Sequence, residues 1–188
     1  MRVEKNFELL KNISSVGIIL RPESPELKDV YQNIKDLFNK VNIDTLLEKE
    51  SAKMIDLDGF EFDDICKKVD FLISVGGDGT LLGVVRKSFK YNLPILGINL
   101  GTLGFLTDIS MNQLENFIVD LKKDIYKINT RMMIEGCINK NSFVAFNDIV
   151  ISRKSISSMI KIEGKIDGKS FNTYYGDGVI VSTPTGST

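Results

Sequence analysis

The sequence contains no histidine and no tryptophan among its 188 residues. Without histidine there is no Ser-His-Asp or Cys-His nucleophile pair and no imidazole metal ligand, so the search for a general base narrows to aspartate and glutamate. The chain also lacks an excess of one charge, since 24 basic and 25 acidic residues give a formal net charge of -1. We therefore expect no general binding to nucleic acid or to a membrane surface, and any bound anion must be held locally.

No apolar run approaches the roughly 20 residues that cross a bilayer. The N-terminal stretch MRVEKNFELLKNISS lacks the apolar centre of a signal peptide. Both absences favour a cytoplasmic protein. The two cysteines, Cys66 and Cys137, form no paired motif, and each lies in an apolar or mixed segment, so we expect both to be buried free thiols.

The first 125 residues alternate between strand-like and helix-like patterns. Short apolar runs predict buried strands over residues 16–20, 71–75 and 95–99. Ser24 and Pro25 are typical of a helix start, and apolar residues then recur at spacings of three and four. Further helices are predicted over residues 80–89 and from Ser110, whose spacing to Gln113 fits a capping box. This order predicts an α/β domain with mainly parallel strands over residues 1–125, with residues 48–60 as an irregular connection.

After about residue 126 the helical period disappears. Runs rich in Val, Ile, Phe and Tyr follow over residues 131–138, 143–153, 159–166 and 178–183. The pair Asp167-Gly168 is typical of a hairpin turn. We therefore expect residues 126–188 to begin a second, predominantly antiparallel β domain.

The stretch VGGDGT after the second predicted strand is the main chemical signal. Gly76 and Gly77 stand between a strand and a helix, where backbone N–H groups and the positive helix end can hold phosphate. The stretch is neither a Walker loop nor a Gly-x-Gly-x-x-Gly fingerprint. Asp78 would repel phosphate, so it is expected to bind magnesium or to take a proton from a hydroxyl, two needs that meet in phosphoryl transfer to an alcohol. The alternative is a tight turn in which Asp78 only caps the helix.

Four motifs carry a resemblance to a known family. The stretch Gly76–Thr80 resembles the signature shared by NAD kinases, diacylglycerol-type lipid kinases and 6-phosphofructokinases. Three further stretches, NLGTLGFLTD from Asn99, NDIVISR from Asn147 and GDGVIVSTPTGST from Gly176, resemble the NAD kinase family of bacterial type. The resemblance runs from the first predicted strand to the last residue. A lipid or sugar kinase of the same superfamily, or a nucleotide-binding module without turnover, remains as an alternative.

The resemblance implies transfer of a phosphate from ATP, or from polyphosphate, to the 2′-hydroxyl of the adenosine ribose of NAD. It implies Asp78 as the catalytic base and a divalent cation, Mg²⁺, whose protein ligands are unknown. The residues implied to lie near the donor phosphates are Gly76, Gly77, Gly79 and Thr80. The residues implied to bind NAD are Asp78, Gly79, Phe105, Asn147, Asp148, Ser158, Tyr175, Asp177, Thr185 and Thr188.

Several of these positions have a second reading or depart from the family. Asn147 and Asp148 could be a polar pair at a β-bulge, Asp177 a turn residue, and Phe105 a core side chain. This chain departs from many bacterial members at three of these positions. Those members carry Glu at the position of Asp148 and basic residues at the positions of Ser158 and Tyr175.

The resemblance also implies an assembly and a longer chain. Family members are generally homodimers or homotetramers in which a neighbouring subunit completes the NAD pocket. Thr188 falls inside a family motif that normally continues with a helix and further strands. We therefore expect a polypeptide of these 188 residues alone to be inactive and to self-associate through unpaired strand edges.

Overall fold

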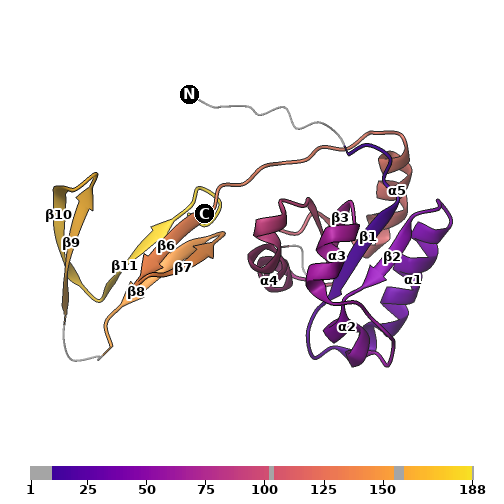
Figure 1. Cartoon of the computed structure of the whole chain (residues 1–188), viewed down its shortest axis with the longest axis horizontal. Coiled ribbons are helices and arrows are strands. Elements are labelled where there is room, and N and C mark those ends of the chain that lie inside the picture. Colours follow the sequence, from indigo (N-terminus) through magenta and orange to yellow (C-terminus); the bar gives the residue numbers. More distant parts are fainter. Residues whose placement is uncertain (1–9, 102–103, 155–158, 188) are drawn as a thin grey trace. The chain divides into compact units, whose positions relative to one another are not determined.

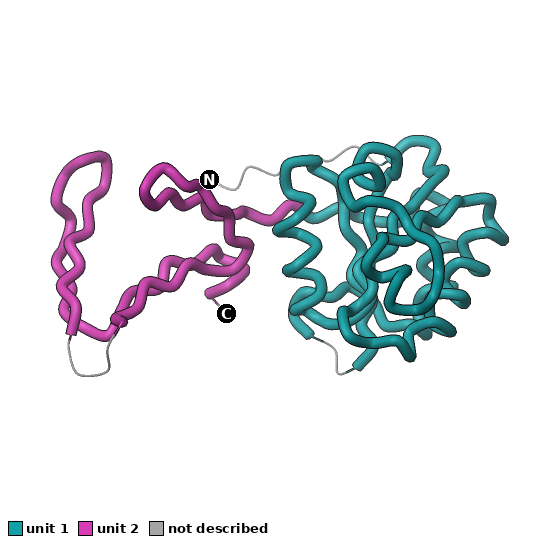
Figure 2. Tube along the Cα trace, turned by 60° about the horizontal axis from the view of Figure 1, so that its bottom comes forward, with its two compact units in different colours: residues 1–129 teal, residues 130–188 magenta. Residues whose placement is uncertain are grey.

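The computed structural model describes residues 10–101, 104–154 and 159–187. The chain divides into two compact units, residues 1–129 and 130–188 (Figures 1 and 2). Unit 1 is a parallel α/β domain and unit 2 consists of antiparallel strand pairs, so the predicted fold class is confirmed. The predicted domain boundary at residue 125 stays a prediction. Within the described residues no helix is both long and apolar enough to cross a membrane.

The centre of unit 1 is a five-stranded sheet in the order β2-β1-β3-β4-β5, with every neighbouring pair parallel. Its strands are β1 Ser15–Leu20, β2 Asp44–Leu47, β3 Phe71–Gly76, β4 Ile95–Asn99 and β5 Ile109–Ser110. β3 is buried along its whole length. A parallel strand covered on both faces reads as a continuous apolar run, which is why this strand was predictable from the sequence.

Helices cover both faces of this sheet (Figure 1). They are α1 Lys28–Asn39, α2 Lys49–Met54, α3 Phe62–Lys68, α4 Asp78–Ser88 and α5 Leu114–Lys122, with short 3₁₀ turns at Pro25–Leu27, Phe89–Tyr91 and Met111–Gln113. The capping box predicted at Ser110 and Gln113 is confirmed. Ser24 does precede the first helical turn, but its hydroxyl does not cap the helix.

Alternating side chains of the strands supply two separate cores. Ile18 and Ile73 pack with α1 and α5 on one face, whereas Leu72 packs with α3 and α4 on the other. Each fully buried aliphatic side chain stabilises the fold by about 1.5–3 kcal/mol relative to an exposed one. On the second face Gly17 lets α3 approach closely, since a β-carbon there would lie 2.4 Å from the Cγ2 atom of Ile65.

The prediction of an irregular connection over residues 48–60 was wrong in part. The structure places α2 there, and the buried Glu48 side chain caps it by accepting a 2.9 Å hydrogen bond from the Ser51 N–H. A helix of only six residues is too short to show a helical period in its sequence. The short elements β2 and α3 were not predicted for the same reason.

The described part of unit 2 forms three two-stranded antiparallel sheets. The strands are β6 Ile134–Ile138 with β7 Asn141–Ala145, β8 Asp148–Ser152 with β11 Gly178–Ser182, and β9 Ile160–Ile166 with β10 Lys169–Gly176. The predicted hairpin at Asp167-Gly168 is confirmed, and both residues have positive φ, as a type I′ turn requires.

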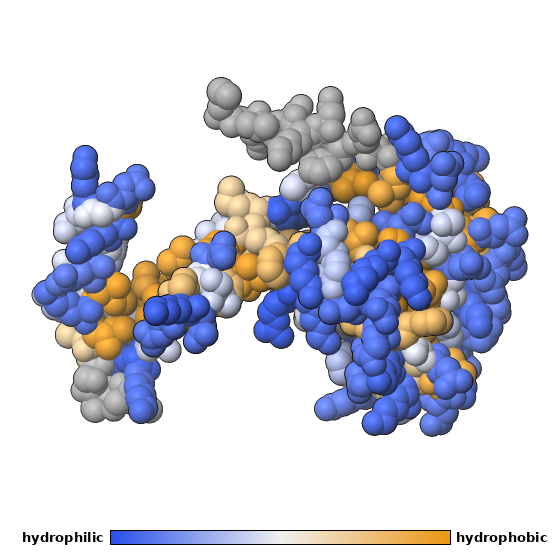
Figure 3. Space-filling view, in the orientation of Figure 1, coloured by the Kyte–Doolittle hydropathy of each residue, from blue (hydrophilic) through white to orange (hydrophobic). Residues whose placement is uncertain are grey.

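Unit 2 has almost no interior of its own. Thr183 is the one buried residue among those that the structure describes from 130 to 187. Apolar side chains such as Val150 and Ile180 remain 59% and 66% exposed, and Figure 3 shows hydrophobic surface along these strands.

The prediction of two buried thiols is correct for Cys66 in α3 and wrong for Cys137, which lies exposed on β6. A two-stranded ribbon cannot cover both of its faces, so its side chains stay in solvent.

Candidate active site

The strand order of unit 1 has a switch point between β1 and β3. From β1 the chain runs outward to β2 and then returns to β3 on the other side of β1. In open parallel sheets, ligands bind at the carboxyl ends of the strands where the order reverses in this way. Arg21 follows β1 and Gly76 ends β3, so both lie at this switch point.

The glycine-rich turn connects β3 directly to α4. Gly77 is the N-cap residue, and its carbonyl accepts hydrogen bonds of 3.0 and 3.1 Å from the N–H groups of Thr80 and Leu81. At Gly76 a β-carbon would lie 2.3 Å from the Thr80 Oγ1 atom, so no larger residue fits there. Apart from the adjacent residues and the backbone of α4 itself, no described atom lies within 4 Å of where β-carbons on Gly77 and Gly79 would stand. The turn therefore leaves open space beside the first N–H groups of a helix, which suits an anion.

Asp78 is the first residue of α4, yet its side chain does not cap the helix. Its Oδ2 atom accepts a hydrogen bond of 3.0 Å from the N–H of Phe105, and its Oδ1 atom accepts from the N–H groups of Leu106 and Thr107, both at 3.2 Å. Gly104 permits this approach, because a β-carbon there would lie 2.3–2.5 Å from the carboxyl group. The alternative of a capping aspartate is thus wrong, and the carboxylate instead holds the loop that follows β4.

A second polar layer supports this arrangement. The Thr107 hydroxyl lies 3.4 Å from Asp78 Oδ1 and accepts a 3.0 Å hydrogen bond from the Asn99 side-chain amide. The Asn99 Oδ1 atom in turn accepts from the N–H of Gly101 at 2.7 Å. Asn99 and Thr107 are only 4% and 7% exposed. Both residues belong to the motif NLGTLGFLTD, but the sequence reasoning gave neither a role, although a polar Asn at the end of a buried strand was the available signal.

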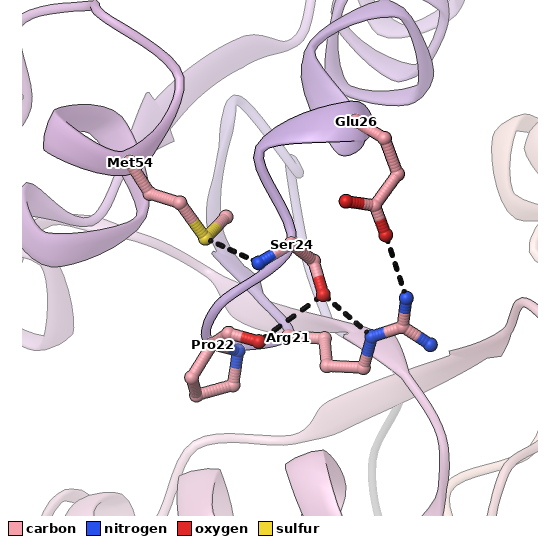
Figure 4. Close-up of polar contacts among 5 residues, drawn as sticks. All are labelled: Arg21, Pro22, Ser24, Glu26 and Met54. Atoms are coloured by element: carbon pink, nitrogen blue, oxygen red, sulfur yellow. Dashed lines mark hydrogen bonds and ion pairs between the residues drawn. The ribbon is translucent and has the colours of Figure 1, made fainter.

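Arg21 is a third residue to which the sequence reasoning gave no role. A β-carbon on Gly76 would lie 3.1 Å from the Arg21 Cβ atom. Figure 4 shows the Arg21 side chain directed at Ser24 and Glu26, with hydrogen bonds of 2.8 Å from Nε to the Ser24 hydroxyl and 2.9 Å from the guanidinium to the Glu26 carboxylate. These partners explain why Ser24 does not cap the helix. The sequence signal was a lone cation directly after the first apolar strand.

Phe105 lies on the same loop with its side chain 91% exposed. The alternative of a core phenylalanine is therefore wrong. An exposed ring next to the N–H group that binds Asp78 offers an apolar surface for a ligand.

In unit 2, Asn147 lies in the break between β7 and β8, not at a bulge within a strand. Its carbonyl accepts from the N–H of Thr183 at 2.8 Å, and a β-carbon on Gly186 would lie 2.4 Å from the same carbonyl oxygen. The side-chain Oδ1 atom of Asn147 is buried without a hydrogen-bond partner in the described structure. A buried acceptor without a partner costs free energy, so this atom suits a donor from a ligand.

Three further predicted NAD-binding residues of unit 2 lie at or beyond the ends of the β8–β11 ladder, namely Asp148, Thr185 and Asp177. Asp148 begins β8 next to Asn147 and pairs with Ser182, and the Thr185 hydroxyl accepts a 3.5 Å hydrogen bond from Arg131. Asp177 lies beyond the opposite end of this ladder, where its carboxylate forms a 2.8 Å ion pair with Arg153.

Asn147 and Asp177 lie one residue beyond opposite ends of the five-residue ladder, which at about 3.4 Å per residue separates them by roughly 20 Å along it. Asp177 and Asn147 are therefore not brought together within unit 2. Tyr175 stands on β10 with its side chain 68% exposed. The two remaining predicted residues, Ser158 and Thr188, lie outside the described residues.

No group of three or more Asp, Glu, Cys or His side chains in the described structure could hold a metal ion. Mg²⁺ is commonly bound through one or two carboxylates together with substrate phosphates. The described residues therefore offer no cage of three or more such side chains.

Comparison with family models gives two successive matches. The ATP-NAD kinase N-terminal domain matches residues 16–126, and the ATP-NAD kinase C-terminal domain matches residues 146–188. Among known proteins, the chain is 50% identical over 182 residues to an NAD kinase of Sulfurimonas denitrificans and 46% identical over 183 residues to one of Wolinella succinogenes. These matches cover 95% of this chain but only 64% and 63% of those proteins.

Two solved structures resemble the fold. Yeast NADH kinase complexed with NADH superposes with a TM-score of 0.82 at 24% identity, covering 94% of this chain and 59% of that chain. An NAD kinase from Archaeoglobus fulgidus in complex with ATP gives a TM-score of 0.68 at 22% identity, covering 92% and 62%. At such identities the likeness concerns the fold alone.

Proposed function

The chain belongs to the ATP-NAD kinase family. On this premise we propose that it is part of an enzyme that transfers the terminal phosphate of ATP to the 2′-hydroxyl of the adenosine ribose of NAD, giving NADP. The observation that carries the proposal is the turn at the end of β3. It combines open space beside helix N–H groups with the carboxylate of Asp78, which accepts hydrogen bonds from the N–H groups of residues 105–107. Phosphoryl transfer to an alcohol needs these two features side by side.

On the donor side, the phosphates bind along the turn formed by Gly76, Gly77, Gly79 and Thr80. Arg21 adds a cation at the same switch point. Its exposed ion pair with Glu26 is worth only about 0–1 kcal/mol, so phosphate oxygens can replace that carboxylate at little cost. The divalent cation, Mg²⁺, enters as part of the Mg-ATP substrate, consistent with the lack of a metal cage among the described side chains.

On the acceptor side, Asp78 accepts the proton of the ribose 2′-hydroxyl. The freed oxygen forms a bond to the terminal phosphorus while the bond from that phosphorus to the bridging oxygen breaks, and ADP leaves with the electron pair. A carboxylate base of this kind contributes about 10²–10⁴-fold in rate. Phe105 lies against the adenosine, and Gly79 allows close approach of the ribose.

The remaining contacts to NAD come from unit 2. Asn147 accepts a hydrogen bond from the adenine amino group through its unpartnered Oδ1 atom, and Asp148 binds the ribose hydroxyls. Further contacts to NAD are assigned to Ser158, Thr185 and Thr188. Tyr175 and Asp177 meet the nicotinamide end.

The place of Asp177 at the far end of the ladder from Asn147 favours an arrangement in which the two act on NAD from different subunits. A homodimer or homotetramer, working in the cytoplasm, supplies that arrangement. Polyphosphate is the alternative donor.

The test is a coupled assay for NADP beside calorimetric titration with NAD, both on the complete gene product. We expect binding of NAD and formation of NADP that requires both Mg²⁺ and ATP. Binding without product would favour a nucleotide-binding module instead. Absence of both would favour a lipid or sugar kinase.

A further inference from the structure

The two oxygens of the Asp78 carboxylate have different surroundings. Oδ1 receives three donors, the N–H groups of Leu106 and Thr107 and the Thr107 hydroxyl, at 3.2, 3.2 and 3.4 Å. Among the described residues, Oδ2 receives one donor, the N–H of Phe105 at 3.0 Å. Each carboxylate oxygen offers about two lone pairs. Oδ1 is therefore saturated by the protein, whereas Oδ2 keeps one lone pair for another donor.

The direction of the Thr107 hydroxyl is fixed by Asn99. The side-chain amide of Asn99 donates to Thr107 Oγ1 at 3.0 Å, so the hydroxyl must place its own proton elsewhere. Asp78 Oδ1 is the acceptor that lies within reach. Asn99 is itself held, since its Oδ1 atom accepts from the N–H of Gly101 at 2.7 Å. Both Asn99 and Thr107 are buried, so water competes little for these hydrogen bonds.

We propose that Asn99 and Thr107 are positioning residues that hold Oδ1 of Asp78, so that Oδ2 is the atom that takes the proton from the acceptor hydroxyl. The inference rests on the proposed function, since it assigns a task to the base of that reaction. Neither residue touches a substrate in this arrangement. A carboxylate released from this hold can rotate, and misplacement of a reacting group by about 1 Å can cost up to 10²-fold in rate.

The test compares Thr107→Val, which removes the hydroxyl at nearly constant volume, with Thr107→Ser, which keeps it. Both variants are made in the complete gene product. Thr107→Val should lower kcat by about 10- to 100-fold and leave KM for NAD and for ATP within about twofold. Thr107→Ser should retain kcat within about threefold. A merely structural role would lower both variants together or raise KM.

A double-mutant cycle with Asn99→Leu tests whether Asn99 acts through Thr107. The double variant should be no slower than Thr107→Val alone, because the link is already broken. If the losses in kcat of the two single variants instead multiply in the double variant, Asn99 does not act through Thr107. Thermal unfolding of each variant shows whether a loss of activity reflects a loss of fold.

Hydrogen exchange gives a readout that does not depend on turnover. The amides of residues 105–107 should exchange faster in Thr107→Val and Asn99→Leu than in the wild type, and Thr107→Ser should resemble the wild type. Unchanged exchange and unchanged kcat in Thr107→Val would overturn the inference. A wild-type protein that forms no NADP would instead overturn the proposed function, and the exchange pattern would still decide the positioning role.

Discussion

The two units of the chain differ in how far they bury their apolar side chains. Every buried apolar side chain that the structure describes lies in unit 1, where two layers of helices cover a parallel sheet. Unit 2 pairs its strands only two by two and leaves large aliphatic side chains in solvent. The site residues follow this division. The turn with Asp78 stands on a rigid framework, whereas Asn147 and Asp177 stand on ribbons that depend on other surfaces for their order.

Separating the units is the sharpest way to test this difference. A fragment of residues 10–129 should unfold cooperatively in denaturant, because it contains both cores. A fragment of residues 130–188 should show no cooperative transition, since isolated two-stranded ribbons are at best marginally stable in water. Circular dichroism and proteolysis of both fragments check this. A cooperative transition in the second fragment would remove the contrast between the units.

The proposed base in unit 1, Asp78, should control turnover and not the binding of NAD. We expect Asp78→Asn to lower kcat at saturating NAD by at least about 10²-fold, because the amide cannot take the proton. The fold should persist, since the amide oxygen can still accept from the loop after β4. Asp58→Asn, on an exposed carboxylate of the same unit, is the matched control and should leave kcat unchanged. Near-normal turnover of Asp78→Asn would show that Asp78 is not the base.

The amide in unit 2 should control binding of NAD. Asn147→Ala should weaken NAD binding by about 1–3 kcal/mol, the usual cost of leaving a buried polar group of the ligand without its partner. Titration with ATP should change less, because the proposed donor site, the turn after β3, belongs to unit 1. Asn141→Ala, at an exposed position of β7, is the control. Equal losses for both nucleotides would indicate a folding defect.

Each unit contains one cysteine, and the two thiols should differ in their titration and reactivity, an effect smaller than those on kcat and NAD binding. Burial raises the pKa of the Cys66 thiol from 9.0 to about 11. The unfolded chain therefore loses this proton before the folded one does, so stability falls as the pH rises from 9 toward 11.

Between pH 8 and 10 the free energy of unfolding should decline by about 1 kcal/mol more in the wild type than in Cys66→Ala. Thiol reagents at pH 8 should label Cys137 at once and Cys66 only in denaturant. Rapid labelling of Cys66 in the folded protein would contradict the burial of α3.

The sequence predicted the parts of unit 1 whose signals are local. The strand Phe71–Gly76 is an almost continuous apolar run, and the glycines at its end predict the turn. The two-residue strand β5 and the six-residue helix α2 are too short to carry a period. Their existence depends on packing against the rest of the sheet.

The surroundings of the site were less predictable, because they come from tertiary contacts. The motif predicts Asp78 as a site residue, but the hydrogen-bond donors to its carboxylate lie 27 to 29 residues further along the chain. Arg21 stands beside Gly76 only because β1 and β3 are neighbours in the sheet. The break at Asn147 was read as part of one long strand, since the apolar pattern continues across it.

The central claim is phosphoryl transfer to the 2′-hydroxyl of NAD, and phosphorus NMR tests it most directly. The complete gene product is incubated with Mg-ATP and either NAD or 2′-deoxyadenosine NAD, which lacks only the acceptor hydroxyl. We predict ADP together with a new phosphomonoester resonance from NAD, no such resonance from the deoxy compound, and loss of the signal in Asp78→Asn. A phosphomonoester formed on the deoxy compound, or none formed on NAD that is demonstrably bound, would contradict the account.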